Sequence, residues 1–223
     1  MRYLWNACCK SGRKVSNPAH NQAFFMNHLA HCLLSGESES VLLGNFIGDY
    51  VKGNAWKHYP AGVQYGLLLH RHIDSFTDVH PLARRSVHRL RPVAGRYAAP
   101  VTDVLYDHLL AIHWDKFTPV PFDVFTEKTY RQLVSLTAQM PPELQERLPR
   151  MVAGRFLHGY SKREGLAWIL DRFSVRLGNK FDAALVSGHF FEKIDHYAED
   201  FNSFFPELLL SAADFRPLSD IIT

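Results

Sequence analysis

Residues 60–76 read PAGVQYGLLLHRHIDSF, and the spacing of their apolar side chains indicates the fold class. Val63, Leu67 and Ile73 recur at intervals that place them on one side of an α-helix. Most other segments show the same helical spacing, whereas the strict alternation of apolar and polar residues that is typical of strands is scarce. The 223 residues are enough to bury one substantial core. The sequence therefore predicts an all-α fold, a helical bundle in a single domain.

Local signals predict where several helices begin and end. Ser161 and Glu164 match a capping box, in which the two side chains satisfy free amides at a helix start. The last long helix is predicted over Ala183–Ser203, with Pro206 kinking or restarting it. Further helices are predicted at residues 27–34, 38–53, 60–76, 83–90, 101–117, 122–139 and 142–152.

Composition and charge argue against several classes of function. The formal net charge is +3 and the sequence pI is about 8.7, without the concentrated stripe of lysine and arginine that is typical of nucleic-acid binding. No apolar run approaches the roughly 20 residues needed to span a bilayer, so no membrane association is predicted. The three cysteines, of which two are adjacent, do not make a disulfide framework, which favours a reducing compartment such as the cytoplasm.

The first 25 residues differ from the rest of the chain. They are polar, basic and aperiodic, and they lack the continuous apolar segment of a secretory signal. The periodic pattern begins abruptly at Met26, which is therefore a candidate for the true start of the protein. We expect residues 1–25 to form a poorly ordered N-terminal extension and residues 26–215 to form the all-α domain.

Histidine and aspartate are concentrated between His28 and His113, an interval that holds nine of the 13 histidines. Residues three or four apart share a helix face, so His70 and Asp74 lie one turn apart on the same side of their helix. The same spacing relates His28 to His31, Asp74 to Asp78, and Asp103 to Asp107. Imidazole and carboxylate together suit manganese, iron, zinc or magnesium. The pattern indicates a metal site.

Two further carboxylates stand in apolar surroundings. Asp49 ends the segment GNFIGD, residues 44–49, whose small residues allow another group to approach closely. Asp107 lies in the middle of a predicted helix. Burying such a charge costs several kcal/mol unless it is paired or bound to a metal. A single histidine or aspartate of this kind is more often exposed, a helix cap or a satisfied core group, so only the joint pattern favours a site.

The order and spacing of four motifs resemble those of the acyl carrier protein phosphodiesterase family, also called acyl carrier protein hydrolases. The resemblance extends from Met26 to around Pro206 and is strongest over residues 26–114. The motifs are MNHLAH (residues 26–31), GNFIGD (44–49), HRHID followed by TD (70–78), and DVLYDH followed by Trp114 (103–114).

The resemblance implies a helical fold distantly similar to the HD-type phosphohydrolases. It also implies manganese-supported hydrolysis of the phosphodiester that joins 4′-phosphopantetheine to a serine of holo acyl carrier protein. Magnesium, iron and zinc are alternative metals. This chain contains no consecutive His-Asp dipeptide, so the ligand scheme of the HD-type enzymes does not transfer directly. Asp49 is the residue whose change should be most damaging to activity.

Under this interpretation the residues take distinct roles. Asp49 is a metal ligand or a water-orienting base, and His108 belongs to the ligand shell or protonates the departing serine oxygen. The predicted metal ligands are His31, His70, Asp74 and Asp107.

The predicted substrate contacts are basic or amide side chains. Asn45 and Arg71 are candidates for phosphate contacts because both offer N–H donors, although a solvent-facing Arg71 is an equal alternative. Acyl carrier proteins are acidic, so Arg172 and Arg176, one turn apart, are candidates for docking. Two other functions stay open: a metal-dependent phosphohydrolase of a nucleotide or another small phosphodiester, and a helical module that binds acyl carrier protein without cleaving it.

Overall fold

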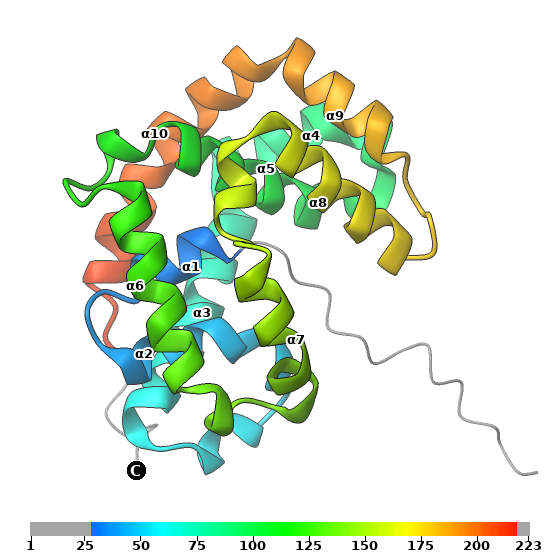
Figure 1. Cartoon of the computed structure of the whole chain (residues 1–223). Helices are drawn as coiled ribbons and strands as arrows, with labels where there is room; N and C mark the ends of the chain where they lie inside the picture. The colour runs from blue at the N-terminus through cyan, green and yellow to red at the C-terminus, as the bar shows by residue number, and fades with distance from the viewer. Residues whose placement is uncertain (1–27, 218–223) are drawn as a thin grey trace, which may run out of the picture.

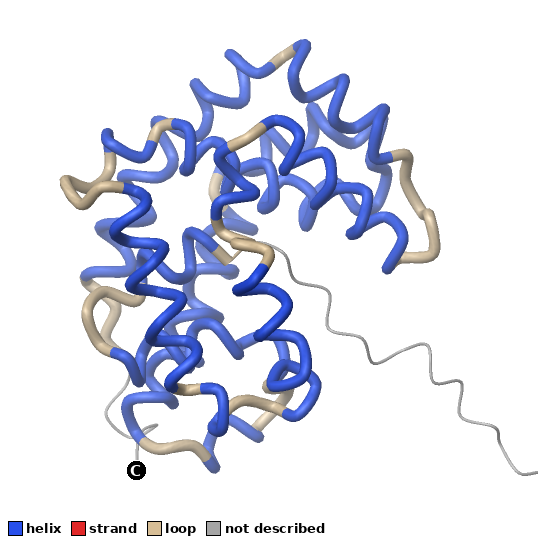
Figure 2. The backbone as a smooth tube through the Cα atoms, in the orientation of Figure 1, coloured by secondary structure: helices blue, strands red, loops and turns tan. Residues whose placement is uncertain are grey.

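The computed structural model describes residues 28–217, and within this range the chain forms α-helices and short 3-10 helices but no strand (Figures 1 and 2). The all-α prediction is confirmed. No helix of the described range is both long and apolar enough to cross a membrane. The predicted N-terminal extension, residues 1–25, lies outside the described residues.

The helix order follows the predicted segments closely, and most predicted boundaries agree within a few residues. Short 3-10 helices fill several connections, of which η2 (Gly48–Tyr50), η5 (Trp114–Lys116) and η7 (His158–Ser161) matter below. The α-helices are α1 (Leu29–Leu34), α2 (Glu39–Ile47), α3 (Ala61–Val79), α4 (Pro81–Ala94), α5 (Ala98–Ile112), α6 (Phe122–Ser135), α7 (Pro142–Ala153), α8 (Arg163–Arg176), α9 (Ala183–Glu192) and α10 (Ile194–Ala213).

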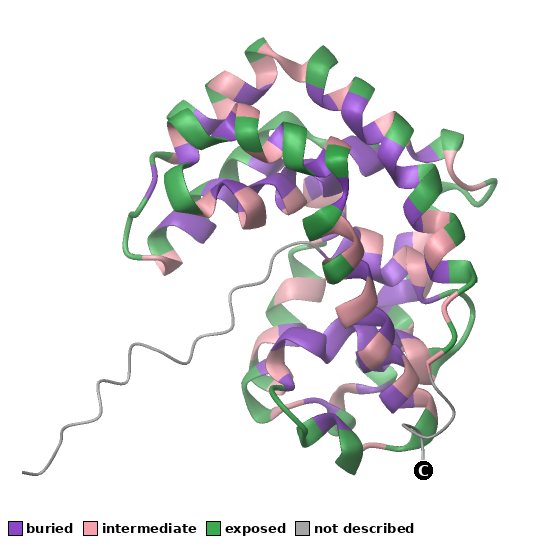
Figure 3. Ribbon diagram, turned by 180° about the vertical axis from the view of Figure 1, so that it is seen from behind, coloured by how far each residue is buried: buried purple, intermediate pink, exposed green. Residues whose placement is uncertain are grey.

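Two clusters of buried apolar residues hold the helices together, and α1 joins them. The larger cluster lies among α4, α5, α8, α9 and α10, and the smaller one among α2, α3, α6 and α7 (Figures 1 and 3). Leu29 of α1 belongs to the larger cluster and Cys32, three residues on, belongs to the smaller one. Helix α1 is therefore clamped from two sides, which fixes the direction of the side chains it carries.

Helices α2 and α3 cross at two glycines. The Cα atom of Gly66 lies 2.8 Å from the position that a Cβ atom on Gly44 would occupy. A Cβ atom on Gly66 would in turn meet the backbone carbonyl of Val41. The small residues of segment 44–49 therefore serve a close helix crossing, in addition to the approach of the His70 ring to Gly48. This crossing brings the end of α2 next to the middle of α3.

Two local predictions are wrong. The capping box at Ser161 does not form: the Ser161 hydroxyl donates to the carbonyl of His158, and Lys162 takes the cap position of α8 without a side-chain hydrogen bond. The last helix also breaks at Lys193 and continues through Pro206. Phe204 and Phe205 are almost fully buried beside Pro206, so tertiary packing outweighs the lost backbone hydrogen bond.

Candidate metal centre

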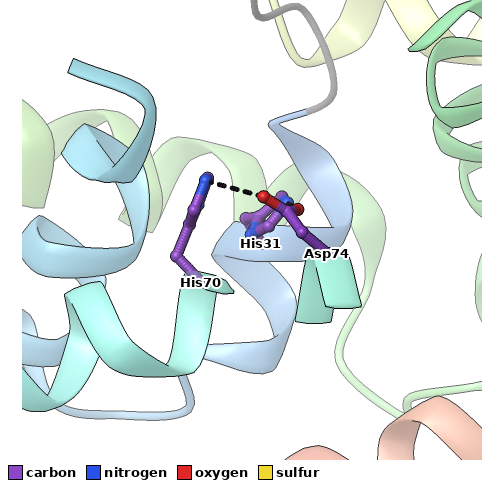
Figure 4. A group of neighbouring side chains, drawn as sticks. All are labelled: His31, His70 and Asp74. Carbon is purple, nitrogen blue, oxygen red and sulfur yellow. Dashed lines mark ion pairs between the residues drawn. The ribbon is translucent and has the colours of Figure 1, made fainter. Parts of the chain in front are cut away.

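Three predicted ligands converge from two helices. His31 comes from α1, and His70 and Asp74 come from successive turns of α3 (Figure 4). The Nε2 atoms of His31 and His70 lie 3.4 Å and 3.2 Å from the two carboxylate oxygens of Asp74, and the rings stack with centroids 4.3 Å apart. Ligand atoms of all three residues lie within 4.8 Å of one another, as a shared metal ion would require. We call these residues the His–Asp group.

Asn45 of α2 fixes the orientation of both imidazoles. Its side-chain oxygen lies 2.7 Å from Nδ1 of His31, and its backbone oxygen lies 2.9 Å from Nδ1 of His70. The side-chain amide nitrogen donates to the carbonyl of His31 and to Ser35 Oγ, which settles which way the amide points. Because an amide oxygen only accepts, each Nδ1 donates, and a neutral ring then directs the lone pair of Nε2 towards Asp74. This is the arrangement in which histidines bind metals.

Asp49 stands beside the group in η2, and it is 6% exposed. Its Oδ1 lies 3.0 Å from Nε2 of His70. A lone pair facing carboxylates is stable only with a cation between them, either a proton or a metal ion. The pKa values follow this logic. Burial alone would lower the pKa of His70, but the hydrogen bonds and charges of Asp49 and Asp74 raise it to about 10. Burial alone would likewise raise the pKa of Asp74, but both histidines lower it.

Within the described residues, Asp107 is not a member of the His–Asp group. Its carboxylate accepts hydrogen bonds from the backbone N–H groups of Leu29 (2.8 Å) and Ala30 (2.9 Å), the first residues of α1. Burial raises the pKa of Asp107 to about 7, although these two N–H groups oppose the rise. The observed contacts make Asp107 a clamp on the start of the helix that carries His31.

His108 is buried at a different place. Its Nδ1 donates to the backbone oxygen of Tyr160 at 2.6 Å, and its ring packs edge-on against Phe190 and Phe191. Burial lowers its pKa, which favours the neutral form. Within the described residues His108 has no contact with the His–Asp group, so its predicted catalytic role has no geometric support.

Arg71 is partly exposed and contacts the backbone. Its guanidinium donates to the backbone oxygens of Val51 (3.4 Å) and Gly53 (2.9 Å), which ties the loop after Asp49 to α3. The contacts of Asn45 and Arg71 therefore position the His–Asp group and its loop, and their predicted phosphate contacts stay predictions.

An acidic cavity of about 330 Å³ opens beside the His–Asp group, with His31 and Asp74 in its wall. We call it the carboxylate cavity because three more aspartates line it. Asp103 is partly buried in its wall; burial and the nearby charges of Asp74 and Asp78 raise the pKa of Asp103 well above the ordinary value. The aspartates are Asp78, Asp103 and Asp107, and the apolar lining includes Ile73, Tyr106, Phe173, Phe201, Phe204, Phe205 and Leu208.

A second cavity, of about 740 Å³, lies between α7 and α8, and we call it the arginine cavity. Arg172 and Arg176, the predicted docking residues, both line it. Arg147 and Arg150 face them from α7, and the sequence interpretation missed both. The sequence could have indicated them, because the two arginines are three residues apart on a strongly amphipathic segment and so share one helix face.

The fold and the site together define an all-helical protein with a buried histidine–aspartate centre suited to a divalent cation. The chain belongs to the acyl carrier protein phosphodiesterase family, whose profile matches residues 26–208. The resemblance found in the motifs is therefore confirmed.

Individual relatives agree with the family match. The chain is 31% identical over 192 residues to the acyl carrier protein phosphodiesterase of Yersinia pestis, covering 84% of this chain and 97% of the relative. The proteins of the same name from Salmonella agona and Klebsiella pneumoniae are 30% and 32% identical, over 84% and 68% of this chain and 98% and 79% of their own lengths. No solved structure matches the chain.

Proposed function

We propose that this protein hydrolyses the phosphodiester between 4′-phosphopantetheine and the serine of holo acyl carrier protein. The products are apo acyl carrier protein and free 4′-phosphopantetheine. Family membership supports the substrate. The observation that supports metal dependence is the convergence of His31, His70 and Asp74, with both imidazoles oriented by Asn45.

The donor atoms fit a hard or borderline divalent cation. Two imidazole nitrogens and the Asp74 carboxylate are available, and the Asp49 carboxylate adjoins them. Manganese is the proposed metal, with magnesium, iron or zinc as alternatives. When bound there, the cation would neutralise charge on the phosphodiester and lower the pKa of a water molecule.

The side chains of the chain supply the proton transfers. Attack by water forms one P–O bond while the P–O bond to serine breaks, and one proton passes from the water to the serine oxygen. Asp49 is the proposed base: burial raises its pKa above the ordinary value, partly offset by the hydrogen bond with His70, so its carboxylate is a better proton acceptor than an exposed one. Asp107 and His108 are proposed to hold α1 and η7 in place.

The proposed partner and compartment follow from the substrate. An acidic carrier protein is the expected macromolecular partner. This carrier protein works in cytoplasmic biosynthesis, so we expect the enzyme to be in the cytoplasm as well. The one described cysteine, Cys32, is a buried free thiol, in keeping with a reducing compartment.

A mass-shift assay tests the reaction. Holo acyl carrier protein is incubated with the protein and Mn²⁺, and intact-protein mass spectrometry follows the loss of the phosphopantetheine mass. We expect complete conversion to the apo form and inactivation by EDTA, with restoration by added Mn²⁺. No conversion with manganese, magnesium, iron or zinc would rule the proposal out. Cleavage of bis(4-nitrophenyl) phosphate without cleavage of holo acyl carrier protein would favour a small-phosphodiester hydrolase instead.

A further inference from the structure

Two cavities of opposite charge flank the helix that carries His31. The carboxylate cavity contains His31 and Asp74 in its wall, and the arginine cavity contains His28, one turn earlier on the chain. Arg147 of the arginine cavity also contacts the hydroxyl of Tyr50, the residue after Asp49, with its Nη1 at 3.4 Å. Each cavity therefore includes or contacts residues of the segments that carry His31 and Asp49.

We propose that this charge difference orients the substrate: the arginine cavity contacts the acidic carrier protein, and the carboxylate cavity takes its uncharged pantetheine arm. This inference rests on the proposed function. It assigns a substrate contact to Arg147 and Arg150, and an arm-binding role to Asp78 and Asp103.

The arginine cavity is built to receive negative charge. Four arginines line it, and among its described lining residues none is acidic. Glu143 pairs with Arg147 at 3.3 Å, but Arg176 Nη1 is buried without a hydrogen-bond partner in the described part of the chain. Burial and the charges of Arg147 and Arg172 lower the pKa of Arg176, as expected where like charges converge. An incoming carboxylate would relieve this repulsion and supply bidentate acceptors.

The N-terminal segment of this chain is not complementary in charge to the arginine cavity. Residues 1–27 contain two arginines and two lysines and no aspartate or glutamate. A segment of that charge is repelled by four arginines. A partner rich in carboxylates is complementary, and the substrate itself is such a partner.

The carboxylate cavity selects the other half of the substrate. The Asp74 carboxylate, which stays charged, and the neighbouring acidic side chains Asp78 and Asp103 disfavour carboxylates and free phosphates, so the acidic protein is excluded from it. The opposite wall is apolar, with Phe201, Phe204 and Leu208. A pantetheine arm offers two amide N–H groups to carboxylate oxygens and methyl and methylene groups to the aromatic wall. The volume of about 330 Å³ is at the lower end of the range of roughly 300–1,000 Å³ for small-molecule sites.

Kinetics on two substrates test the orientation. One substrate is holo acyl carrier protein, and the other is the 4-nitrophenyl diester of 4′-phosphopantetheine, which keeps the arm but has no protein. The charge reversals Arg150→Glu and Arg172→Glu change exposed residues of the arginine cavity. We expect them to raise KM for the holo protein roughly tenfold at low salt and to leave the nitrophenyl diester unaffected. Arg131→Glu, an exposed arginine of α6 outside the cavity, is the matched control.

Filling the carboxylate cavity should have a different signature. Ala99→Phe places a ring in that cavity from a partly exposed position, and Ala99→Leu is the smaller alternative if the first variant folds poorly. We expect either change to raise KM for both substrates and to abolish competitive inhibition by free pantetheine, which the arginine variants retain.

The outcomes separate the two proposals. If the wild type cleaves holo acyl carrier protein but the arginine variants lose inhibition by pantetheine, the orientation is reversed and the inference fails. Equal KM values for all variants on both substrates would also overturn it. If the wild type cleaves neither substrate with any metal, the proposed function itself fails.

Discussion

Two buried ionic clusters join helices in this protein, and their hydrogen bonds are completed in different ways. Asp200 of α10 is fully buried and accepts from Arg85 Nε (2.5 Å), Ser86 Oγ (2.8 Å) and Arg89 Nη1 (2.6 Å) of α4. In the His–Asp group both Nδ1 atoms already donate to Asn45, and both Nε2 atoms face carboxylates. The Asp200 cluster is held mainly by arginine donors that are always charged, whereas the Nε2 atoms of the His–Asp group meet the carboxylates through a cation, either a proton or a metal ion.

Exposure separates the two clusters as well. The side chain of Asp74 is 45% exposed and borders a cavity, whereas that of Asp200 is fully enclosed. An ion pair that is enclosed on all sides is typical of a structural contact, and a paired carboxylate that borders a cavity is typical of a site. The comparison teaches that access from a cavity, more than ion pairing itself, distinguishes a candidate site from a structural ion pair.

Of the two clusters, the His–Asp group should give the larger loss of activity when one of its side chains is removed. We expect His70→Ala to lower kcat/KM by about 10³-fold, equivalent to about 4 kcal/mol, because a ligand and the partner of Asp49 are both lost. The matched control is His72→Ala, which removes an imidazole of the same helix that contacts Ser211. Steady-state kinetics with holo acyl carrier protein give the comparison. Equal losses of kcat/KM in both variants would show that the effect comes from a general disturbance of α3 rather than from loss of the His–Asp group.

Breaking the Asp200 cluster should act on stability instead. Asp200→Ala leaves the buried Ser86 hydroxyl and Arg89 without their shared acceptor, so we expect the free energy of unfolding to fall by about 1–3 kcal/mol. At a temperature where the variant is folded, kcat should stay within about twofold of the wild type. Urea unfolding followed by circular dichroism measures the first quantity. A stable variant with reduced kcat would reverse the assignment of the two clusters.

The support given by Asn45 should have an intermediate effect. Asn45→Ala removes the acceptor of His31 Nδ1 but keeps the backbone acceptor of His70. Loss of such outer contacts typically weakens metal binding by about 10–100-fold. Mn²⁺ titration monitored by thermal unfolding tests this without relying on activity. The expected sign is a smaller rise in Tm at a given Mn²⁺ concentration than in the wild type, and an unchanged rise would argue against the role of Asn45.

Lowering the pH should have a smaller effect on stability, and this effect should come from a third buried group, His28, at pH values where the Asp200 cluster still contributes. Burial, with the charges of His31 and Arg147, lowers the pKa of His28 from 6.5 to about 3. Between these pH values the unfolded chain binds a proton that the folded chain does not, so stability falls as pH decreases below about 6.5. Burial alone would raise the pKa of Asp200, but its donors lower it below 3.8, so its contribution persists above that pH.

Urea unfolding between pH 7 and pH 4.5 isolates His28 when the wild type is compared with a variant at this position, because the other buried groups, Asp107 and His70 among them, titrate in both proteins. We expect the wild type to lose stability over this range more steeply than His28→Gln, whose amide does not titrate. Parallel pH profiles for the two proteins would show that His28 is not held neutral in the folded state.

The sequence predicts the parts of the site that rest on helix periodicity. His70 and Asp74 are one turn apart on a long helix, so their proximity follows from local geometry alone. The meeting of His31 with them depends on α1 packing between two cores, which no local rule provides. The prediction of His31 as a ligand came instead from the resemblance of its motif, MNHLAH, to the family.

Local rules leave open which partner a polar side chain takes, and the predicted ligand role of Asp107 stays a prediction. Asp107 has the residue type and spacing of a ligand, but in the folded chain its carboxylate caps α1. Ser161 matches a capping box in sequence, yet its hydroxyl is used by the preceding turn. Arg147 and Arg150 become part of a cavity only when α7 faces α8. Tertiary packing decides which of several chemically possible partners a polar side chain takes.

The glycine crossing of α2 and α3 has a consequence for the motions of this molecule. Backbone meets backbone at Gly44 and Gly66, so no side chain lies between the helices that could repack if one of them moved alone. The two helices should then open to solvent as one cooperative unit, with their amide protons exchanging at a common rate. Asn45 is next to this crossing and His70 is one turn beyond it. The contact between Asn45 and His70 should therefore be lost only in the same rare event that opens the crossing.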